Sequence, residues 1–256
     1  MGIDIYNIVL ETTRKCNMKC AHCLRGEPQN KCMDDQHMRD FLLQVDYIST
    51  VTFTGGEPTL PSGMKIIERF MEICNELGVD VGNFFIVTNA KTWRNKFPEL
   101  IHRLYDFCSD NDVSGIDISG DKFHETNGIE RNDFRYRLEE ILEWEYGISG
   151  LISERPDIEY RYVIAEGRGV HINNKELELD EIICEYWDGV FHIKEGTIYL
   201  NCDGKVLNGC DWSYKSQNER KDIFICNASD DLEECVLNYE HTVNESEEMI
   251  EDLMYG

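Results

Sequence analysis

The sequence has 256 residues, which is enough for one large domain with a full hydrophobic core, or for a domain with a small appendage. Its 50 acidic residues outnumber its 25 Lys and Arg residues, so the formal net charge is −25. This charge excludes a general nucleic-acid binder, because neutralising phosphates requires clustered Lys and Arg. It also argues against binding to anionic membrane surfaces.

The cysteine content is the second unusual feature of the composition. The 11 cysteines are an odd number, so they cannot all pair within the chain. The sequence shows no secretory signal and no apolar run near the roughly 18 residues that span a bilayer. We therefore predict a cytoplasmic protein with reduced thiols. Reduced cysteines in this number favour metal binding over use as small core residues.

Through Gly169 the sequence alternates strand-like and helix-like segments. In chain order the predicted elements are a strand at Ile3–Leu10, a helix from Asp34 or Asp35 through Ile48, a strand at Thr50–Thr54, a helix from Ser62 to Gly78, a strand at Phe84–Thr88, a helix at Pro98–Cys108, a strand at Val113–Ser119, a helix at Asp133–Tyr146 and a strand at Ile158–Ala165. This alternation predicts βαβ units, a parallel α/β sheet and functional residues at the carboxyl ends of the strands.

The pattern changes after Gly169, and we divide the chain into residues 1–172 and 173–256. The predicted elements of the second part are a helix over Leu177–Tyr186 and short strands at Val190–Ile193, Thr197–Asn201 and Lys205–Leu207, with Asp203-Gly204 as a hairpin turn. The last 35 residues carry eleven acids and no Lys or Arg. They predict solvated amphipathic helices, with docking of a basic partner as the alternative.

The strongest local motif is Cys16-Asn-Met-Lys-Cys20-Ala-His-Cys23, which follows the first predicted strand. A loop this short can direct three thiolates to one point, and three thiolates suit a [4Fe–4S] cluster in which one iron has no protein ligand. Two alternatives stay open on the spacing alone. One is a zinc site with His22 or a distant residue as the fourth ligand, and the other is three unrelated thiols.

A second motif, Thr54-Gly55-Gly56-Glu57-Pro58, follows the second predicted strand. Glycine lets the backbone approach a ligand closely, and Glu57 offers an acceptor for an ammonium group. By itself the motif favours an ordinary strand-to-helix turn before Pro58.

With both motifs at successive strand ends, the sequence resembles the radical SAM superfamily over about residues 1–170. The resemblance implies a partial (β/α)6 barrel, TIM-like in architecture. It implies that Cys16, Cys20 and Cys23 hold the [4Fe–4S] cluster and that Gly55-Gly56-Glu57 binds the amino-acid end of S-adenosylmethionine (SAM). One electron from the cluster would then cleave SAM to a 5′-deoxyadenosyl radical, which removes a hydrogen atom from the substrate.

The resemblance extends to later strand ends. It places Thr88 and Asn89 near the adenosine, Ser119 and Asp121 near the ribose, and Arg168 near the cofactor; the last is equally a solvated loop residue. Four further residues are candidates for contact with substrate or for donating a hydrogen atom, with purely structural or exposed roles as the alternative: Lys122, His124, Cys32 and Cys108.

Five cysteines lie in the second part of the chain, and two of them flank a predicted hairpin. This arrangement resembles the start of the SPASM and twitch extensions of radical SAM enzymes, which hold auxiliary iron–sulfur clusters, although the dense cysteine run of a full SPASM domain is absent. One auxiliary cluster, a zinc ion or no metal are the alternatives. The expected ligands are Cys184, Cys202, Cys210 and Cys226, with Cys235 as substitute.

The predicted function is that of an oxygen-sensitive radical SAM enzyme that modifies a peptide or protein side chain. Flavodoxin or ferredoxin is the expected electron donor. Three alternatives remain from the sequence: a radical SAM enzyme acting on a small molecule or nucleotide, a glycyl-radical activating enzyme, and a non-catalytic zinc or iron–sulfur binding module.

Overall fold

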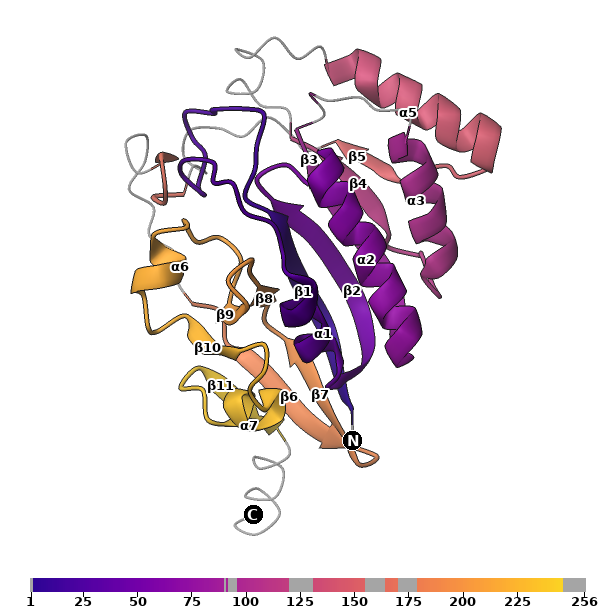
Figure 1. Cartoon of the computed structure of the whole chain (residues 1–256). Helices are drawn as coiled ribbons and strands as arrows, with labels where there is room; N and C mark the ends of the chain where they lie inside the picture. The colour runs from indigo at the N-terminus through magenta and orange to yellow at the C-terminus, as the bar shows by residue number, and fades with distance from the viewer. Residues whose placement is uncertain are drawn as a thin grey trace.

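The computed structural model describes residues 2–89, 91, 96–119, 131–154, 164–169 and 179–245. Parallel strands alternate with helices through the first part of this range (Figure 1). In chain order these elements are β1 (Ile3–Thr13), α1 (Asp35–Leu42), β2 (Val45–Gly55), α2 (Pro61–Leu77), β3 (Asp80–Thr88), α3 (Lys96–Phe107), β4 (Gly115–Ile118), α5 (Arg131–Tyr146) and β5 (Ile152–Glu154). The predicted parallel α/β architecture is confirmed.

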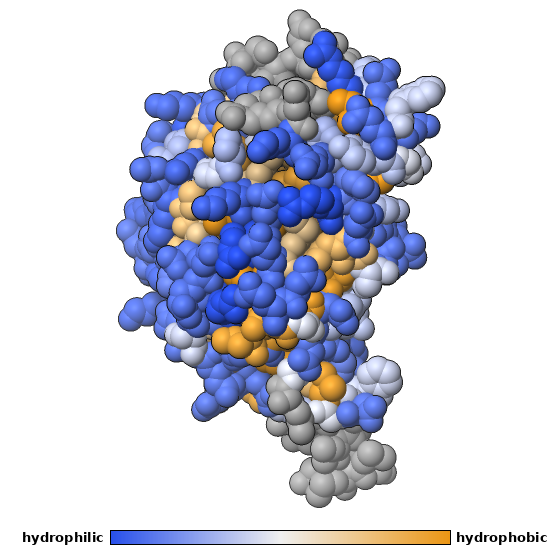
Figure 2. Space-filling model, turned by 45° about the vertical axis from the view of Figure 1, so that its right-hand side comes forward, coloured by the Kyte–Doolittle hydropathy of each residue, from blue (hydrophilic) through white to orange (hydrophobic). Residues whose placement is uncertain are grey.

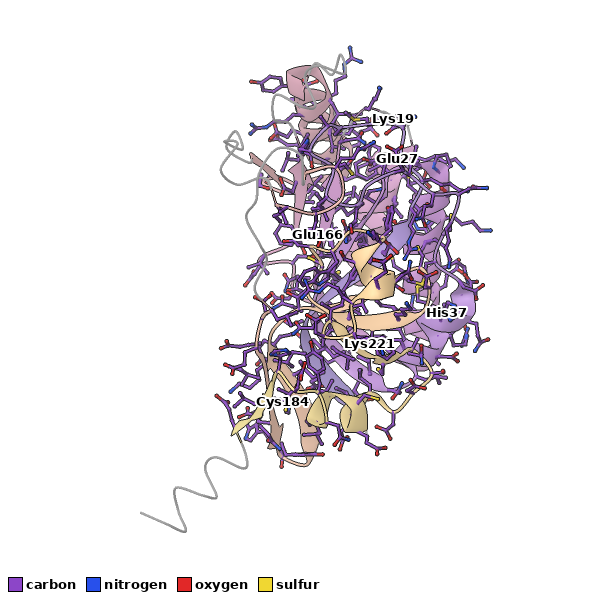
Figure 3. All side chains as sticks on the ribbon, turned by 90° about the vertical axis from the view of Figure 1, so that its left-hand side faces the viewer. Lys19, Glu27, His37, Glu166, Cys184 and Lys221 are labelled. Carbon is purple, nitrogen blue, oxygen red and sulfur yellow. The ribbon has the colours of Figure 1, made fainter. Side chains whose placement is uncertain are left out.

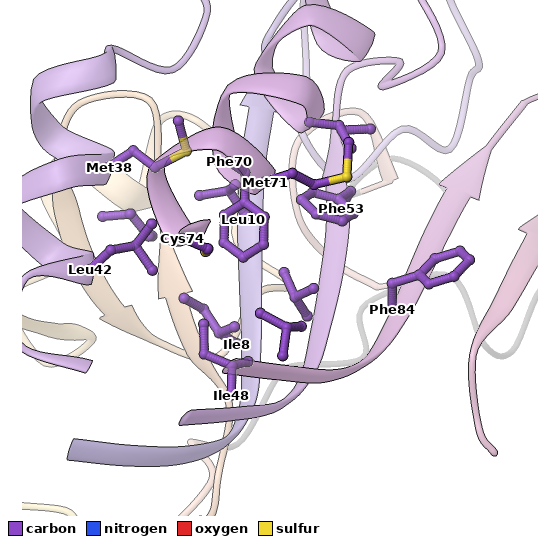
Figure 4. Close-up of a cluster of buried hydrophobic side chains, with 14 of the residues drawn as sticks. Ile8, Leu10, Met38, Leu42, Ile48, Phe53, Phe70, Met71, Cys74 and Phe84 are labelled. Atoms are coloured by element: carbon purple, nitrogen blue, oxygen red, sulfur yellow. The ribbon is translucent and has the colours of Figure 1, made fainter. Parts of the chain in front are cut away.

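The core lies between the sheet and the row of helices α1, α2 and α3. The helix α2 turns one apolar face toward the strands, and the ring centroid of its Phe70 lies 5.3 Å from that of Phe53 on β2. Figure 4 shows side chains from β1, β2, α1 and α2 meeting in this layer, among them Ile8, Met38 and Cys74. The helix ends where Gly78 adopts a φ of 76°, a conformation that glycine takes without steric cost.

The first helix is shorter than predicted, and the prediction that it continues through Ile48 is wrong. Asp34 caps α1 by accepting a hydrogen bond of 2.8 Å from the Gln36 amide, but the helix ends at Leu42. Val45 and Ile48 are three residues apart, which is typical of a helix face. Both belong to β2 instead, because an irregularity in the pairing with β1 puts both side chains on the buried face.

The second part of the chain extends the same sheet. Its elements are β6 (Ile182–Trp187), β7 (Val190–Glu195), β8 (Ile198–Leu200), β9 (Lys205–Asn208), α6 (Ser216–Glu219), β10 (Phe224–Asn227), α7 (Leu232–Leu237) and β11 (Thr242–Asn244). Strands β7 and β8 pair in parallel with β1 on the edge opposite β2. The first strand of the chain is therefore an inner strand of the sheet.

Two other predictions for the second part need correction. Residues 182–186, the last part of the predicted helix, belong to β6 instead, in which buried and partly exposed side chains alternate from Ile182 to Glu185. The predicted helical tail contains one short helix, α7, between two strands, within the residues that the structure describes up to 245. The predicted strands from Val190 to Leu207 are confirmed.

Three expectations fall on positions outside the described residues: most of the strand at 158–165, the boundary at residues 172 and 173, and the last eleven residues.

Hydrophilic side chains cover most of the face shown in Figure 2, with smaller apolar patches between them. Among the described helices, none is long and apolar enough to cross a membrane.

Candidate functional site

The cysteine motif lies in the loop that follows β1, here called the cysteine loop (residues 14–29). The loop turns back on itself, because the Cys23 amide donates to the Cys20 carbonyl at 3.2 Å. Its closing residue, Gln29, donates to the Arg14 carbonyl at 2.9 Å. Three thiols are thus held on one short loop at the carboxyl end of an inner strand, where a parallel sheet places its functional groups.

The two glycines of the second motif allow β2 to end directly against the cysteine loop. The Gly56 amide donates to the Thr13 carbonyl at 2.6 Å, and the Glu57 amide donates to the Lys15 carbonyl at 2.8 Å. A Cβ atom on Gly55 or Gly56 would lie 2.2 Å from one of these carbonyl oxygens, and Gly55 has a φ of 137°. Here the glycines are needed for contact between two protein loops.

Replacing Gly56 by Ala should therefore displace the cysteine loop. Since the added Cβ would meet backbone atoms of Lys15 and Arg14, we expect the free energy of unfolding to fall by about 1–3 kcal/mol and iron binding to weaken. Gly189→Ala is the control: it has a φ of 81° and open space around it, so it should cost about 1–2 kcal/mol without changing iron content. Equal iron content in Gly56→Ala and wild type would contradict this role.

Glu57 joins the carboxyl ends of β2 and β3. Its side chain is 1% exposed, and its carboxylate accepts hydrogen bonds from the Thr59 hydroxyl at 2.5 Å, the Thr88 hydroxyl at 2.6 Å and the Asn89 amide at 2.8 Å. Burial raises the pKa of Glu57, and these hydrogen bonds oppose the rise. The carboxylate that was expected to accept an ammonium group is thus already held by protein donors, of which Thr59 carried no signal in the sequence.

Groups from several strand ends meet around Cys16. The amide nitrogen Nδ2 of Asn89 lies 3.8 Å from the Cys16 sulfur and 3.0 Å from Oδ1 of Asn17. Burial raises the pKa of Cys16 to about 11; the negative charges of Glu57 and Cys23 add to the rise, and Arg168 opposes it.

The segment around Arg168 packs on the far side of the cysteine loop. The Arg168 amide donates to the Cys23 carbonyl at 2.9 Å, and its guanidinium donates to Glu27 at 3.0 Å. A Cβ atom on Gly167 would lie 2.2 Å from the Leu24 carbonyl. Of the remaining predicted residues, Ser119 directly follows β4, and its amide donates to the Thr88 carbonyl at 2.8 Å.

Asp121, Lys122 and His124 lie outside the described residues.

The two candidate thiols, those of Cys32 and Cys108, lie at opposite ends of the sheet. The Cys32 sulfur is 3.4 Å from the Thr13 hydroxyl, next to the cysteine loop. Cys108 follows α3, and the next residue, Ser109, bonds to Val81 at the start of β3; burial raises the pKa of Cys108 to about 12. Only Cys32 is near enough to the loop to remain a candidate.

The cysteines of the second part are not assembled as one ligand set. The Cys202 thiol donates to the Glu11 carbonyl at 3.2 Å, and the thiols of Cys226 and Cys235 hydrogen-bond to each other. Cys184 lies on β6, far from Lys19 and Glu27 of the cysteine loop (Figure 3). Among residues 179–245, all of which are described, no three ligand side chains converge on a metal position. The same is true of Cys16, Cys20 and Cys23, so the auxiliary cluster stays a prediction. The hydrogen bonds of Cys202, Cys226 and Cys235 favour purely structural thiols.

Iron content tests this conclusion directly. A Cys184→Ala/Cys226→Ala double variant, reconstituted without oxygen, should hold the same iron as wild type, about four atoms per chain. An auxiliary cluster predicts instead about eight atoms in wild type and about half of that in the variant, which would contradict the conclusion.

A buried polar network, which no sequence motif indicates, connects the cysteine loop to the second part of the chain. The Glu11 carboxylate, 0% exposed, accepts hydrogen bonds from Arg14 at 2.9 Å and from the Tyr199 hydroxyl at 2.8 Å. Arg14 also donates to Gln217 at 2.9 Å. At the other end of the loop, Arg25 donates to the Trp212 carbonyl at 2.8 Å. Both ends of the loop are therefore fastened to residues 199–217.

The chain was compared with known proteins at the level of families, sequences and structures. No protein-family model matches it. An uncharacterized protein of Methanocaldococcus jannaschii is 31% identical over 117 residues, which are 44% of this chain and 40% of that protein. The chain thus spans about two fifths of the length of the curated relative that it matches.

Two solved structures superimpose on 93% of this chain and on 81% of theirs, with TM-scores of 0.56 and 0.57 and identities of 11% and 12%. Both are native anSMEcpe with bound AdoMet (SAM), one with the Kp18Cys peptide and one with the Cp18Cys peptide. The chain therefore shares the fold of these two proteins. The predicted fold class is thereby confirmed, and the cysteine loop follows the first strand of this fold.

The donor set of the cysteine loop fits a [4Fe–4S] cluster. Three thiols within eight residues would supply three ligands and leave one iron without a protein ligand. In the described part of the chain, no three ligand side chains are placed together as a metal site. The Tyr214 hydroxyl also suits a bound cluster. It is buried beside the loop and has no hydrogen-bond partner among the described residues, so a bound group could accept its hydrogen bond.

Proposed function

We propose that the protein is a radical SAM enzyme whose cluster is held by Cys16, Cys20 and Cys23. The observation that carries this proposal is the packing of the Gly55-Gly56-Glu57 segment on the cysteine loop, at the carboxyl end of adjacent strands in a radical SAM fold. When bound, the cluster supplies the electron that cleaves SAM and so produces a 5′-deoxyadenosyl radical.

The residues of the chain orient this chemistry rather than perform it. Glu57 fixes the ends of β2 and β3 and so holds Thr88 and Asn89 in place. Asn89 lies beside the Cys16 thiol, where it would meet SAM bound to the open iron. Arg168 offers a positive charge on the other side of the loop. We propose that Ser119 and Asp121, at and just after the end of β4, contact the ribose.

We propose a peptide or protein side chain as the substrate. Support comes from the two structural neighbours, each of which binds a peptide together with AdoMet. The net charge of −25 favours a substrate with basic residues near the modified position, because opposite charges steer association. A flavodoxin or ferredoxin would deliver the electron.

Anaerobic reconstitution tests the proposal. Wild-type protein should bind about four iron atoms per chain, and addition of dithionite and SAM should release 5′-deoxyadenosine. Peptides with basic residues should increase its release and return with a changed mass. Colourless protein with one bound zinc ion would overturn the proposal, and turnover with small molecules but no peptide would overturn only the substrate class.

A further inference from the structure

The buried hydroxyl of Tyr214 is the strongest polar feature that the proposed function leaves unexplained. The residue is 4% exposed, and its hydroxyl has no hydrogen-bond partner among the described residues. Proteins rarely bury a hydroxyl without a partner, because the donor loses its hydrogen bond to water and gains nothing in return. A partner that is bound at this place would remove that cost.

The position of the ring shows where such a partner would be. The Tyr214 amide donates to the Arg25 carbonyl at 3.2 Å, and the guanidinium carbon of Arg14 lies 4.7 Å from the centre of the Tyr214 ring. Arg14 precedes Cys16 by two residues, and Arg25 follows Cys23 by two. The ring therefore lies between the two ends of the cysteine loop. The Cys23 thiol is also among the groups that raise the pKa of Tyr214, after burial and Glu11.

The protein acceptors nearby are already used. The Glu11 carboxylate accepts from Arg14, from the Tyr199 hydroxyl and from the Cys202 amide. The Trp212 carbonyl, two residues before Tyr214, accepts from Arg25 and Gln217. Among the described residues these acceptors are taken, and the cysteine loop next to the ring would carry thiolate and sulfide sulfur atoms as acceptors in its cluster-bound form.

We propose that Tyr214 donates a hydrogen bond to the Cys23 thiolate or to an adjacent sulfide of the cluster. Tyr214 is then a positioning residue that makes the cluster easier to reduce, because hydrogen bonds to cluster sulfur stabilise the more negative reduced form. This inference rests on the proposed function. The second part of the chain would then act on the cluster held by Cys16, Cys20 and Cys23, and this role does not require an auxiliary cluster.

The test compares the reduction potentials of reconstituted wild type and Tyr214→Phe. Iron content should be equal, and the equilibrium constant for reduction by the same donor should fall about tenfold, a shift of about 59 mV for a one-electron couple. Tyr239→Phe is the matched control, since its hydroxyl donates to the Asp222 carbonyl in the second part of the chain. Its potential should equal that of wild type.

A second variant covers the case in which Tyr214→Phe does not retain a cluster. A fluorinated tyrosine at position 214 keeps the shape of the side chain and is a stronger donor, so it should raise the potential. Unchanged potentials in the variants that retain iron would overturn this inference while wild-type cleavage of SAM upholds the proposed function. Wild type that binds no iron would overturn both.

Discussion

Replacing Cys16 by Ala should abolish 5′-deoxyadenosine formation and most iron binding. The loop supplies all three protein ligands of the proposed cluster, so two thiols would remain for a site that needs three. We expect the rate of SAM cleavage to fall by at least about a thousandfold, because the cofactor carries the chemistry and the chain has no substitute for it. Iron analysis and quantification of 5′-deoxyadenosine measure both effects.

Cys235→Ala is the control for this prediction. Its thiol is partly exposed and contacts Cys226 in the second part of the chain, so iron content and SAM cleavage should stay at wild-type values. Far-ultraviolet circular dichroism should show that both variants keep the fold. A Cys16→Ala protein with full iron and normal SAM cleavage would disprove the assignment of the cysteine loop.

Replacing Arg14 by Met should cause a large loss of stability. Arg14 is 2% exposed and neutralises the buried Glu11 carboxylate at 2.9 Å; it also bonds to Gln217 at 2.9 Å and lies 2.8 Å from Asp203. Removing one partner of a buried ion pair leaves the other charge without compensation, which costs about 3–5 kcal/mol. Urea unfolding of the metal-free variant measures the change in the free energy of unfolding.

Arg103→Met provides the same substitution in an exposed ion pair. Its partner is Glu68 at 2.7 Å, and the side chains are 46% and 41% exposed, so the loss should stay within about 1 kcal/mol. Adding Glu11→Gln to Arg14→Met should recover part of the lost stability, because the buried negative charge is gone. Equal losses in the two single variants would show that the buried network contributes little.

The position of the candidate site could be predicted from the sequence, but the hydrogen-bond partners around it could not. Both motifs directly follow an apolar segment, and the carboxyl ends of parallel strands meet at one edge of a sheet, so their proximity could be predicted. The bonds of Arg14 to Gln217 could not, since the partners are 203 positions apart and polar pairs of this kind leave no periodic pattern. The hydrogen bonds that the Glu57 carboxylate accepts from Thr59 and Thr88 could not be predicted from the sequence either.

Local irregularities explain the errors in secondary structure. The spacing of Val45 and Ile48 resembles a helix only because the pairing of β2 with β1 is irregular at that point. Residues 182–187 contain acidic and aromatic side chains that fit either structure, and pairing with β7 and β11 makes them a strand. Tertiary contacts decided both cases, as they often do for short segments.

The place of β1 has a consequence for biosynthesis. This strand is made almost 190 residues before β7 and β8, yet one of its edges pairs with them. Until then the nascent chain exposes an unpaired edge of apolar residues, which invites association with other chains. The ends of the cysteine loop also acquire their partners only with Trp212 and Gln217. The cysteine loop therefore reaches its final contacts only after the residues up to Gln217 have been made.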